Sequence, residues 1–301
     1  MSEITFKPWN PAKLAWFITG ASSGFALEIA RIALSNGHDV IATSRNPGSK
    51  PGIKKEIEDL GGRWVPLELD DLNSASTIHN LEKEGTHIDV LFNCAGYAFL
   101  GPAEIASEEE LRKQMDTNFF GPSRLVRACV KYMRERRRGM IVNISSGAGV
   151  EGRDSMSAYG ASKAAMDRLI HVLSKEVAPF NVRTLTVSLG TFNTNFSNTL
   201  VAPAAALPQD YVGSAADKVM QTVNNMHGFN PNFGDAKKAS QAMYDVIVGQ
   251  GIGQGREAEK LLPLGRDLYA ATKMALDRQT HALEIFGDVC NNVYPDTDEG
   301  K

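Results

Sequence analysis

The chain has little cysteine and no excess of positive charge. Its three cysteines, Cys94, Cys129 and Cys290, are too few and too scattered for a disulfide framework, and no paired cysteine and histidine spacing indicates a zinc site. Lysine and arginine number 32 against 35 aspartates and glutamates, a net charge of −3 that excludes the basic surplus typical of nucleic-acid-binding proteins. We therefore expect a protein of a reducing compartment, with no metal and no nucleic-acid partner.

Long apolar runs are also missing. Nowhere do about eighteen apolar residues follow one another without interruption, so we expect no membrane span. The segment 1–10 lacks the positive start and the apolar stretch of a secretory signal, and we expect a cytoplasmic protein. With 301 residues, 43% of them hydrophobic and 22% charged, the chain can bury a substantial core.

What the chain does contain is an alternation of short apolar runs with segments of helical spacing. This alternation predicts one α/β domain rather than two domains of different type. Right-handed crossovers then give a doubly wound parallel sheet of seven strands, with a ligand crevice at the carboxyl ends of the strands. The expected strands lie near 14–18, 39–43, 64–69, 88–92, 139–145, 182–188 and 259–263, and long buried helices at 107–137 and 156–178.

Three side chains in the middle of the chain form a pattern suited to proton transfer. Tyr159 and Lys163 stand four residues apart, and Ser146 lies thirteen residues before Tyr159 at the end of a strand-like run. On a helix this spacing places phenol and ammonium on one face, where the charge is expected to lower the tyrosine pKa. Such a tyrosine can act in carbonyl reduction or alcohol oxidation. The spacing alone leaves open an ordinary amphipathic helix, our interpretation of the similar pair Tyr269 and Lys273.

A glycine-rich turn near the N-terminus predicts the other half of such a reaction. The apolar run 14–18 leads into the turn 19–26, and a helical pattern follows over 27–34. Glycines in such a turn let the backbone approach a pyrophosphate, and the helix N-terminus presents free N–H groups to it. The expected contacts in this dinucleotide site are Gly20, Ser22, Ser23, Gly24 and Phe25.

The end of the second strand bears on the choice of cofactor. An acidic side chain there would accept hydrogen bonds from the ribose hydroxyls of NAD and would repel the 2′-phosphate of NADP. This chain has Ser44 and the cation Arg45 instead, which favours NADP(H). The alternative for Arg45 is a solvated residue in the turn before 46–48.

Several motifs together resemble the short-chain dehydrogenase/reductase family, and within it the hydroxysteroid- and retinol-dehydrogenase-like branch. The resemblance runs from about residue 14 to residue 289. It implies a Rossmann-type domain over 14–289, with an N-terminal extension at 1–13, a helical substrate lid at about 191–235 and a flexible tail at 290–301. The motifs occur in the family's order: Thr19-Gly20-x-x-x-Gly24-x-Ala26, Leu69-Asp70, Asn93-Cys94-Ala95-Gly96, Asn118, Ser146 and Tyr159-x-x-x-Lys163.

The resemblance implies a role for each member of a catalytic tetrad. Tyr159 would donate a proton to the nascent alkoxide, and Ser146 would hydrogen-bond the substrate oxygen. Lys163 would hold the nicotinamide ribose and lower the pKa of Tyr159, and Asn118 would position a water that links Lys163 to solvent. The hydride itself would come from the cofactor.

The resemblance also extends the cofactor site along the chain. Asp70 would accept from the adenine amino group, and the 93–96 turn would wall the adenosine. Besides the glycine-turn residues, Ser44 and Arg45, the implied contacts are Asp70, Asp71, Asn93, Ala95, Gly96, Tyr159, Lys163, Gly190, Thr191 and Thr194.

Three departures from the family pattern affect this site. Ala26 replaces a third glycine, so that its methyl group would narrow the approach of helix to cofactor. Cys94 replaces a second asparagine, and we interpret it as a small buried residue. Leu189 stands where a proline is usual, which would free the backbone expected to contact the nicotinamide carboxamide.

The lid segment is apolar and interrupted by proline, which favours a bulky, largely apolar substrate such as a steroid, terpenoid or polyketide carbonyl of secondary metabolism. The alternative is that these apolar residues only pack the lid onto the domain. The C-terminal helix, expected to reach about Val289, would cover one side of the pocket. The expected substrate contacts are Tyr97, Phe99, Val150, Arg153, Phe196 and Leu200.

The sequence therefore predicts an NADP(H)-dependent oxidoreductase that interconverts a ketone and a secondary alcohol. The resemblance also implies a homodimer or homotetramer through the helices at 107–137 and 156–178. Two alternatives remain: the same site used for dehydration, isomerisation or cyclisation, or a non-catalytic NADPH-binding sensor. The departures at Ala26 and Leu189 leave the first alternative open, whereas the complete tetrad argues against both.

Overall fold

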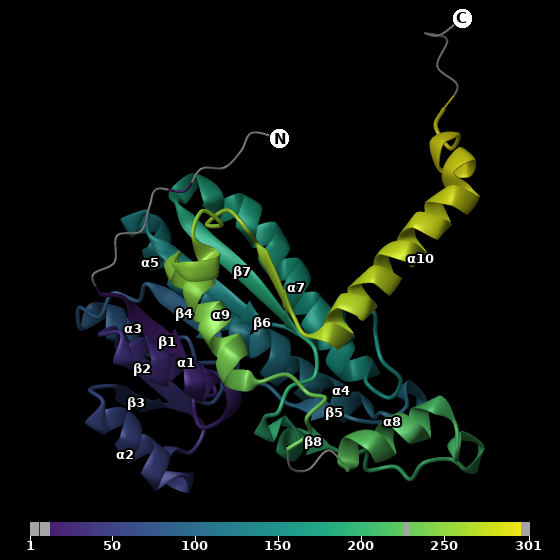
Figure 1. The fold of residues 1–301 in the computed structure, drawn as a ribbon, viewed down its shortest axis with the longest axis horizontal. Helices are drawn as coiled ribbons and strands as arrows, with labels where there is room; N and C mark the ends of the chain where they lie inside the picture. The colour runs from purple at the N-terminus through teal and green to yellow at the C-terminus, as the bar shows by residue number, and fades with distance from the viewer. Residues whose placement is uncertain (1–5, 7–12, 226–228, 296–301) are drawn as a thin grey trace, which may run out of the picture.

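A seven-stranded parallel sheet forms the centre of the protein (Figure 1). The computed structural model describes residue 6 and residues 13–225 and 229–295. The strand order β3-β2-β1-β4-β6-β7-β9 reverses direction between β1 and β4, which confirms the predicted doubly wound fold. The strands are β1 (Ala15–Ile18), β2 (Asp39–Ser44), β3 (Arg63–Pro66), β4 (Val90–Asn93), β6 (Gly139–Ile144), β7 (Val182–Leu189) and β9 (Leu261–Leu264).

Helices cover both faces of this sheet, because alternate residues of each strand point to opposite sides. Trp16 and Ile18 of β1 belong to a core cluster with α1 and α9, whereas Phe17 belongs to a second cluster with α3, α5 and α7. The central strand β4 is buried along its whole length, which agrees with its largely apolar sequence, Val-Leu-Phe-Asn. The helices are α1 (Gly24–Ser35), α2 (Pro51–Asp59), α3 (Ser76–Lys83), α4 (Glu108–Met115), α5 (Gly121–Arg136), α6 (Gly147–Val150), α7 (Ser157–Val177), α8 (Ala215–Asn224), α9 (Ala236–Val248) and α10 (Arg266–Asn291).

The long helix predicted at 107–137 is interrupted. A π-helical turn, Asp116–Phe120, separates α4 from α5. Pro122, at the start of α5, has no N–H to continue the regular ladder, and Gly121 packs so closely on Leu69 that a Cβ would lie 2.7 Å from its carbonyl oxygen. The segment is therefore held by packing that helical periodicity does not reveal. The third strand also ends at Pro66, three residues earlier than predicted.

A small parallel sheet lies beyond the carboxyl ends of the main strands and was not predicted. It pairs β5 (Ala98–Phe99) with β8 (Leu200–Val201), two strands too short for a period to be visible in the sequence. It joins the segment after β4 to the predicted lid, whose helix α8 lies at the same edge (Figure 1). Short 3₁₀ helices complete the described chain at Pro47–Ser49, Ala103–Ile105, Ala178–Phe180, Asn195–Thr199, Gln209–Tyr211 and Gly251–Gly253.

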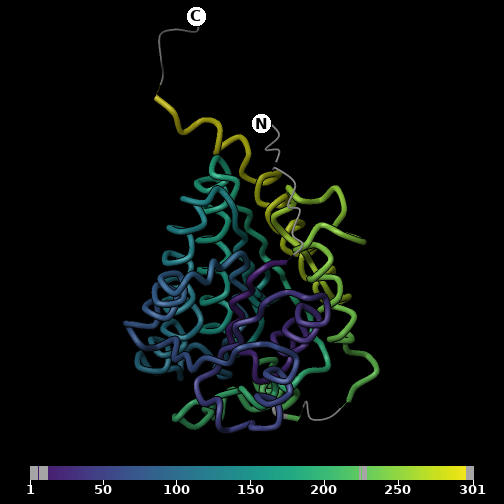
Figure 2. Tube along the Cα trace, turned by 90° about the vertical axis from the view of Figure 1, so that its left-hand side faces the viewer, coloured from purple at the N-terminus to yellow at the C-terminus, as the bar shows by residue number. Residues whose placement is uncertain are grey.

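The C-terminal helix α10 leaves the body of the protein, as both views show (Figures 1 and 2). Leu268 and Ala275 are buried, whereas apolar side chains further along, such as Leu283 and Phe286, are 65% and 62% exposed. The expectation that this helix covers one side of the pocket therefore holds only for its first turns, because the rest has no element to pack against in the described chain. The helix continues to Asn291, beyond the predicted boundary.

Parts of the predicted domain scheme fall on segments for which no structure is given. Most of the predicted N-terminal extension, 1–13, lies outside the described residues, as do residues 296–301 of the predicted tail. In the described chain, no helix is long and apolar enough to cross a membrane.

Candidate active site

Two adjoining cavities open at the carboxyl edge of the main sheet. The first, of about 280 Å³, contains Ser146, Tyr159 and Lys163, and we call it the tyrosine cavity. The second, of about 220 Å³, contains the turn from Thr19 to Phe25 and is called the glycine cavity. The two share one wall, which we call the common wall, and it consists of Phe25, Cys94, Gly96, Thr194 and Phe196.

The glycine cavity has the features of a cradle for a dinucleotide. Gly20 and Gly24 have φ angles of +74° and +60°, which other residues rarely adopt, and a Cβ on Gly20 would lie 2.9 Å from the Cα of Ala95. Helix α1 begins at Gly24, and its N-cap Ser23 makes no side-chain capping bond. Its first N–H groups are therefore available to an anion such as a pyrophosphate.

Other predicted cofactor residues also line the glycine cavity. Ser22, Ser44, Arg45, Ala95 and Gly96 do so together with the glycine-turn residues. The Arg45 side chain is exposed, and Ser44 accepts a hydrogen bond from the indole N–H of Trp64 at 3.1 Å. The Thr19 hydroxyl accepts from the backbone N–H groups of Cys94 and Ala95 at 2.9 and 3.1 Å. This hydroxyl thereby connects the turn after β4 to the turn after β1. With the free N–H groups at the start of α1, the residues of the glycine cavity fit a cofactor that carries two anionic phosphates.

Three predicted cofactor residues line neither cavity. Asp70 accepts a hydrogen bond from the Thr117 hydroxyl at 2.7 Å. Asp71 accepts a hydrogen bond from the backbone N–H of Asn73, two residues later. Leu67, Glu68 and Leu69 form that side of the glycine cavity instead. Asn93 is buried within β4, and its side-chain nitrogen and oxygen have no hydrogen-bond partner among the described residues. These positions were predicted from motifs, which do not show which way a side chain points.

Tyr159 and Ser146 meet at the bottom of the tyrosine cavity. Ser146 caps the short helix α6 by accepting from the N–H of Ala148 at 3.2 Å, and Tyr159 lies in the first turn of α7 with only 6% of its surface exposed. Burial raises the pKa of Tyr159 to about 12, although a hydrogen bond with Ser146 acts in the opposite direction. The expected lowering of this pKa is therefore wrong for this structure.

The position of Lys163 explains that result. Its ammonium group donates to the backbone oxygen of Ile144 at 2.8 Å and lies 5.8 Å from the centre of the Tyr159 ring. The side chain lies one helical turn below Tyr159, as predicted, but its charge is directed to the end of β6. Burial also lowers the pKa of Lys163, and the nearby carboxyl of Asp167 partly offsets this effect.

Asn118 is in the interior, next to but not within the two cavities. It lies in the π-helical turn, where its side-chain amide donates to the carbonyl of Tyr97 at 3.0 Å and to the Ser162 hydroxyl at 3.1 Å. Its amide oxygen accepts from the N–H of Tyr97 at 3.2 Å. In this structure Asn118 therefore holds the segment after β4 in place. That it positions a water next to Lys163 remains a prediction.

Two departures from the family pattern have little effect on the site. The methyl group of Ala26 is fully buried in the core beneath α1 and lines neither cavity, so that the expected narrowing is not found. Cys94 is half-buried in the common wall, and burial raises the pKa of its thiol to about 11. A thiol with this pKa is protonated at neutral pH, which agrees with the interpretation of Cys94 as a small packing residue.

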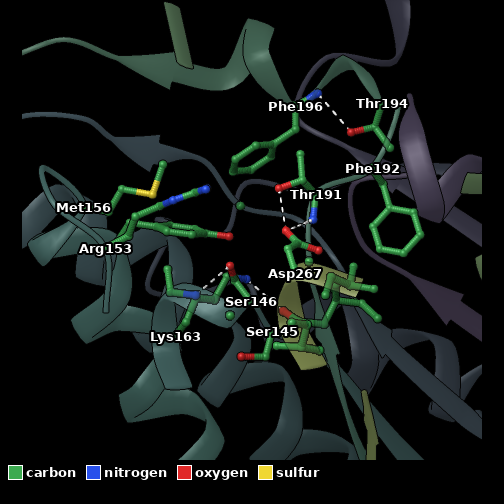
Figure 3. Close-up of a pocket in the computed structure, with 18 of the residues that line it drawn as sticks. Ser145, Ser146, Arg153, Met156, Lys163, Thr191, Phe192, Thr194, Phe196 and Asp267 are labelled. Carbon is green, nitrogen blue, oxygen red and sulfur yellow. Dashed lines mark hydrogen bonds between the residues drawn. The ribbon is translucent and has the colours of Figure 1, made fainter. Parts of the chain in front are cut away.

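The third departure, at Leu189, is compensated by α10. The carboxylate of Asp267 accepts from the N–H and the hydroxyl of Thr191 at 2.8 and 2.7 Å (Figure 3). Gly190 lies so close to this carboxylate that a Cβ would overlap it, and its own N–H donates to Leu264 of β9 at 2.8 Å. The turn after β7 is thus fixed without the proline.

The predicted substrate residues divide into two groups. Phe196 and Arg153 line the tyrosine cavity, and the Phe196 ring lies 5.8 Å from that of Tyr159. The other predictions are not confirmed by position: Tyr97 lines the glycine cavity, Phe99 and Leu200 are engaged in the small sheet, and Val150 lines neither cavity. Because Phe99 and Leu200 belong to the paired strands β5 and β8, they are packing residues of the small sheet.

Much of the actual cavity wall was missed. Thr191 and Thr194, predicted for the cofactor, do line the tyrosine cavity, as does Gly190. Phe192 and residues from three more segments join them, and nothing in the sequence indicated that these segments meet. The additional lining residues are Phe192, Val223, Phe233, Asp267, Leu268 and Ala271.

A doubly wound sheet with a glycine cradle at the switch of strand order, next to a half-buried serine and a buried tyrosine and lysine, defines a nucleotide-dependent oxidoreductase of the α/β class. The family model described as short chain dehydrogenase matches residues 15–204. The protein belongs to the short-chain dehydrogenase/reductase family, whose members use NAD(H) or NADP(H).

Individual proteins agree with this assignment. The chain is 40% identical to oxidoreductase claN of Passalora fulva over 214 residues, 70% of this chain and 96% of that protein. It is 34% identical to a 3-ketodihydrosphingosine reductase of Bacteroides thetaiotaomicron over 275 residues, 89% of this chain and 96% of that protein. The structure is similar to that of a short-chain dehydrogenase from Streptomyces avermitilis, with a TM-score of 0.83, 29% identity, and coverage of 95% of this chain and 100% of that one.

Proposed function

We propose that the protein is an NADP(H)-dependent reductase that interconverts a ketone and a secondary alcohol on a bulky, largely apolar molecule. One observation carries this proposal: Ser146, Tyr159 and Lys163 converge in one cavity that shares a wall with the glycine cradle. This arrangement supports the proposal, because carbonyl reduction requires a proton donor next to the dinucleotide.

The residues of this chain have distinct parts in the proposed reaction. The reduced nicotinamide supplies a hydride when it is bound. Ser146 holds the substrate oxygen by a hydrogen bond, and the phenol of Tyr159 gives its proton to that oxygen as the alkoxide forms. Lys163, held at the end of β6, contributes positive charge close to both groups and donates to the cofactor ribose.

The choice of NADP(H) depends on the end of β2. Arg45 is an exposed cation at the rim of the glycine cavity, where the adenine ribose is bound in this fold. The only carboxylate among the described lining residues of this cavity is Glu68, at the end of the next strand. A guanidinium pairs well with a phosphate, which supports the assignment of the 2′-phosphate to Arg45.

The nature of the substrate follows from the walls of the tyrosine cavity. Phe192, Phe196, Met156 and Val223 offer apolar surface around the hydroxyls of Ser146 and Tyr159. The name of the Bacteroides relative, a 3-ketodihydrosphingosine reductase, supports a ketone with a large apolar part. Exposed apolar side chains on α4 and α7, Leu111 and Val172, support a homodimer or homotetramer, which sedimentation velocity tests.

The proposal is tested by following NADPH oxidation against a panel of steroid, terpenoid, quinone and polyketide ketones. In Tyr159→Phe we expect turnover to fall by roughly a thousandfold, because the proton donor is removed, while NADPH still binds and its fluorescence still increases. Tyr269→Phe is the matched control, since that tyrosine is 74% exposed on α10 and should leave turnover unchanged. Full turnover in Tyr159→Phe would show that another group donates the proton.

A further inference from the structure

The charges that line the tyrosine cavity are not all used by the protein. Three described lining residues have ionisable side chains of the lysine, aspartate or arginine type: Lys163, Asp267 and Arg153. Lys163 donates to a backbone oxygen, and Asp267 accepts two hydrogen bonds from Thr191. For the Arg153 guanidinium, no ion pair or hydrogen bond is found within the described chain. The guanidinium of Arg153 therefore has no partner among the residues that the structure describes.

The neighbourhood of Arg153 shows why it has no partner. Glu151, two residues earlier, directs Oε1 to Arg278 of α10 at 2.8 Å, and its Oε2 is buried without a hydrogen-bond partner among the described residues, so that Glu151 does not pair with Arg153. Figure 3 shows the Arg153 side chain extending toward the open space between Met156 and Phe196, on the opposite side of the cavity from Thr191 and Asp267. An arginine among apolar groups, at the entrance of a ligand cavity, is in a position to bind a ligand anion.

The loop that bears Arg153 is held in place on both sides. Gly152 has a φ of +82° and Ser155 a φ of +59°, so that the loop follows a path few sequences allow. The Ser155 hydroxyl donates to the carbonyl of Ala216 at 3.0 Å, and its carbonyl accepts from the N–H of Gly101 at 2.8 Å. These bonds attach the loop to α8 and to the small sheet. The backbone of Arg153 is therefore positioned before any ligand binds.

We propose that Arg153 binds an oxyanion on the substrate, a carboxylate, sulfate or phosphate ester that is separated by an apolar body from the reacting carbonyl. The substrate is then an anionic amphiphile rather than a purely apolar ketone. This inference rests on the proposed function, because it assigns the second end of a molecule whose carbonyl lies at Ser146 and Tyr159. The apolar side chains Met156 and Phe196 contact the body between the two ends.

The test compares matched acids and esters. The probes are unbranched oxo acids of increasing length with the ketone next to the terminal methyl group, each with its methyl ester, and a keto-steroid with and without a sulfate on its far end. For at least one length we expect the acid to have a KM about tenfold to a hundredfold below that of its ester, the range for a charge-assisted hydrogen bond, with similar kcat. The oxo acids and the steroid sulfate distinguish a carboxylate from a sulfate as the preferred group.

Variants then assign the preference to one side chain. Arg153→Gln should abolish the difference in KM between acid and ester, Arg153→Lys should keep part of it, and Arg153→Glu should reverse it. In all three, the change should fall mainly on the KM of the acid, because Arg153 takes no part in proton transfer. Arg134→Gln, which removes an exposed arginine of α5 outside the cavity, is the control for net charge. Since Arg153 is exposed and has no partner to lose, we expect the thermal midpoint to stay within about 2 °C.

The outcomes separate the two proposals. If the wild-type protein reduces both acid and ester with equal KM and Arg153→Gln changes neither, the inference about Arg153 is wrong and the proposed function stands. If neither compound, nor any ketone of the wider panel, is reduced, both proposals are overturned. Calorimetry on Tyr159→Phe provides a readout without turnover: the acid should bind more tightly than the ester by the same ratio, and equal affinities would contradict the proposal.

Discussion

The glycine cavity and the tyrosine cavity lie side by side, yet they are built in different ways. The glycine cavity comes from segments that directly follow β1, β2, β3 and β4, so that short stretches of sequence determine most of it. The tyrosine cavity collects residues from Phe25 to Ala271, including α8 and the start of α10. The first is a property of strand ends, whereas the second is a property of how distant segments pack.

The two cavities also differ in their charge and polarity. The glycine cavity has backbone N–H groups at the start of α1 and the cation Arg45 at its rim, features that bind phosphates of any dinucleotide. The tyrosine cavity has apolar walls, and its ionised groups other than Arg153 are engaged with the protein. The common fold therefore explains the cofactor, while the particular substrate must be recognised by residues specific to this chain.

The largest effect that separates the cavities is expected at Arg45. Arg45→Asp removes a cation and places a carboxylate opposite the 2′-phosphate, so we expect NADPH to bind about a hundredfold more weakly while NADH binds at least as well. The ratio of kcat/KM for the two cofactors measures this shift. Arg45→Lys should preserve most of the preference. An unchanged ratio in Arg45→Asp would place the determinant of cofactor choice elsewhere in the glycine cavity.

A second distinction concerns pH, to which only the tyrosine cavity should respond. With the pKa of Tyr159 raised to about 12, the phenol is protonated at lower pH and only about one molecule in a thousand is ionised near pH 9. Reduction, which uses the protonated form, should therefore be nearly independent of pH, whereas alcohol oxidation should rise about tenfold per pH unit up to at least pH 9. NADPH affinity should not follow this rise.

The pH profile also tests the effect of Lys163 in the working enzyme. If oxidation reaches a plateau near neutral pH, the tyrosine is more acidic with cofactor bound than in this structure. That result would support the lower pKa expected from the spacing of Tyr159 and Lys163. The profiles are recorded at saturating cofactor, so that a change in rate with pH reports ionisation and not cofactor binding. Ser146→Thr, which retains the hydroxyl, should show the same profile.

The smallest effect is expected at two glycines that both have positive φ. Gly20→Ala introduces a Cβ 2.9 Å from Ala95, whereas Gly37→Ala meets nothing within 4 Å. Both should lower the free energy of unfolding by about 1 kcal/mol because of backbone strain, with a larger loss for Gly20→Ala. Only Gly20→Ala should also weaken NADPH binding, by about tenfold. Equal NADPH affinities in the two variants would mean that Gly20 has only a conformational role.

The sequence allowed most of the fold and the chemical centre of the site to be predicted. Residues that follow a strand or occupy one turn of a helix, such as Ser146, Tyr159 and Lys163, have positions set by local geometry, and the structure brings them together. Other expected site residues lie elsewhere in the structure. Asp70 and Asn93 belong to motifs but line neither cavity, while Phe99 and Leu200 are used in a two-stranded sheet. Asp267 and Leu268 could not be predicted because α10 reaches the site only through tertiary packing.

The common wall sets a limit on how this protein could be redesigned. Phe25, Cys94, Gly96, Thr194 and Phe196 line both cavities, so that we expect a substitution at any of them to alter the affinity for cofactor and for substrate at once. Arg45 and Arg153 each border one cavity alone. If the proposed roles hold, the choice of cofactor can be changed at Arg45 and the choice of substrate at Arg153 independently, whereas changes at the five shared positions have to be made together.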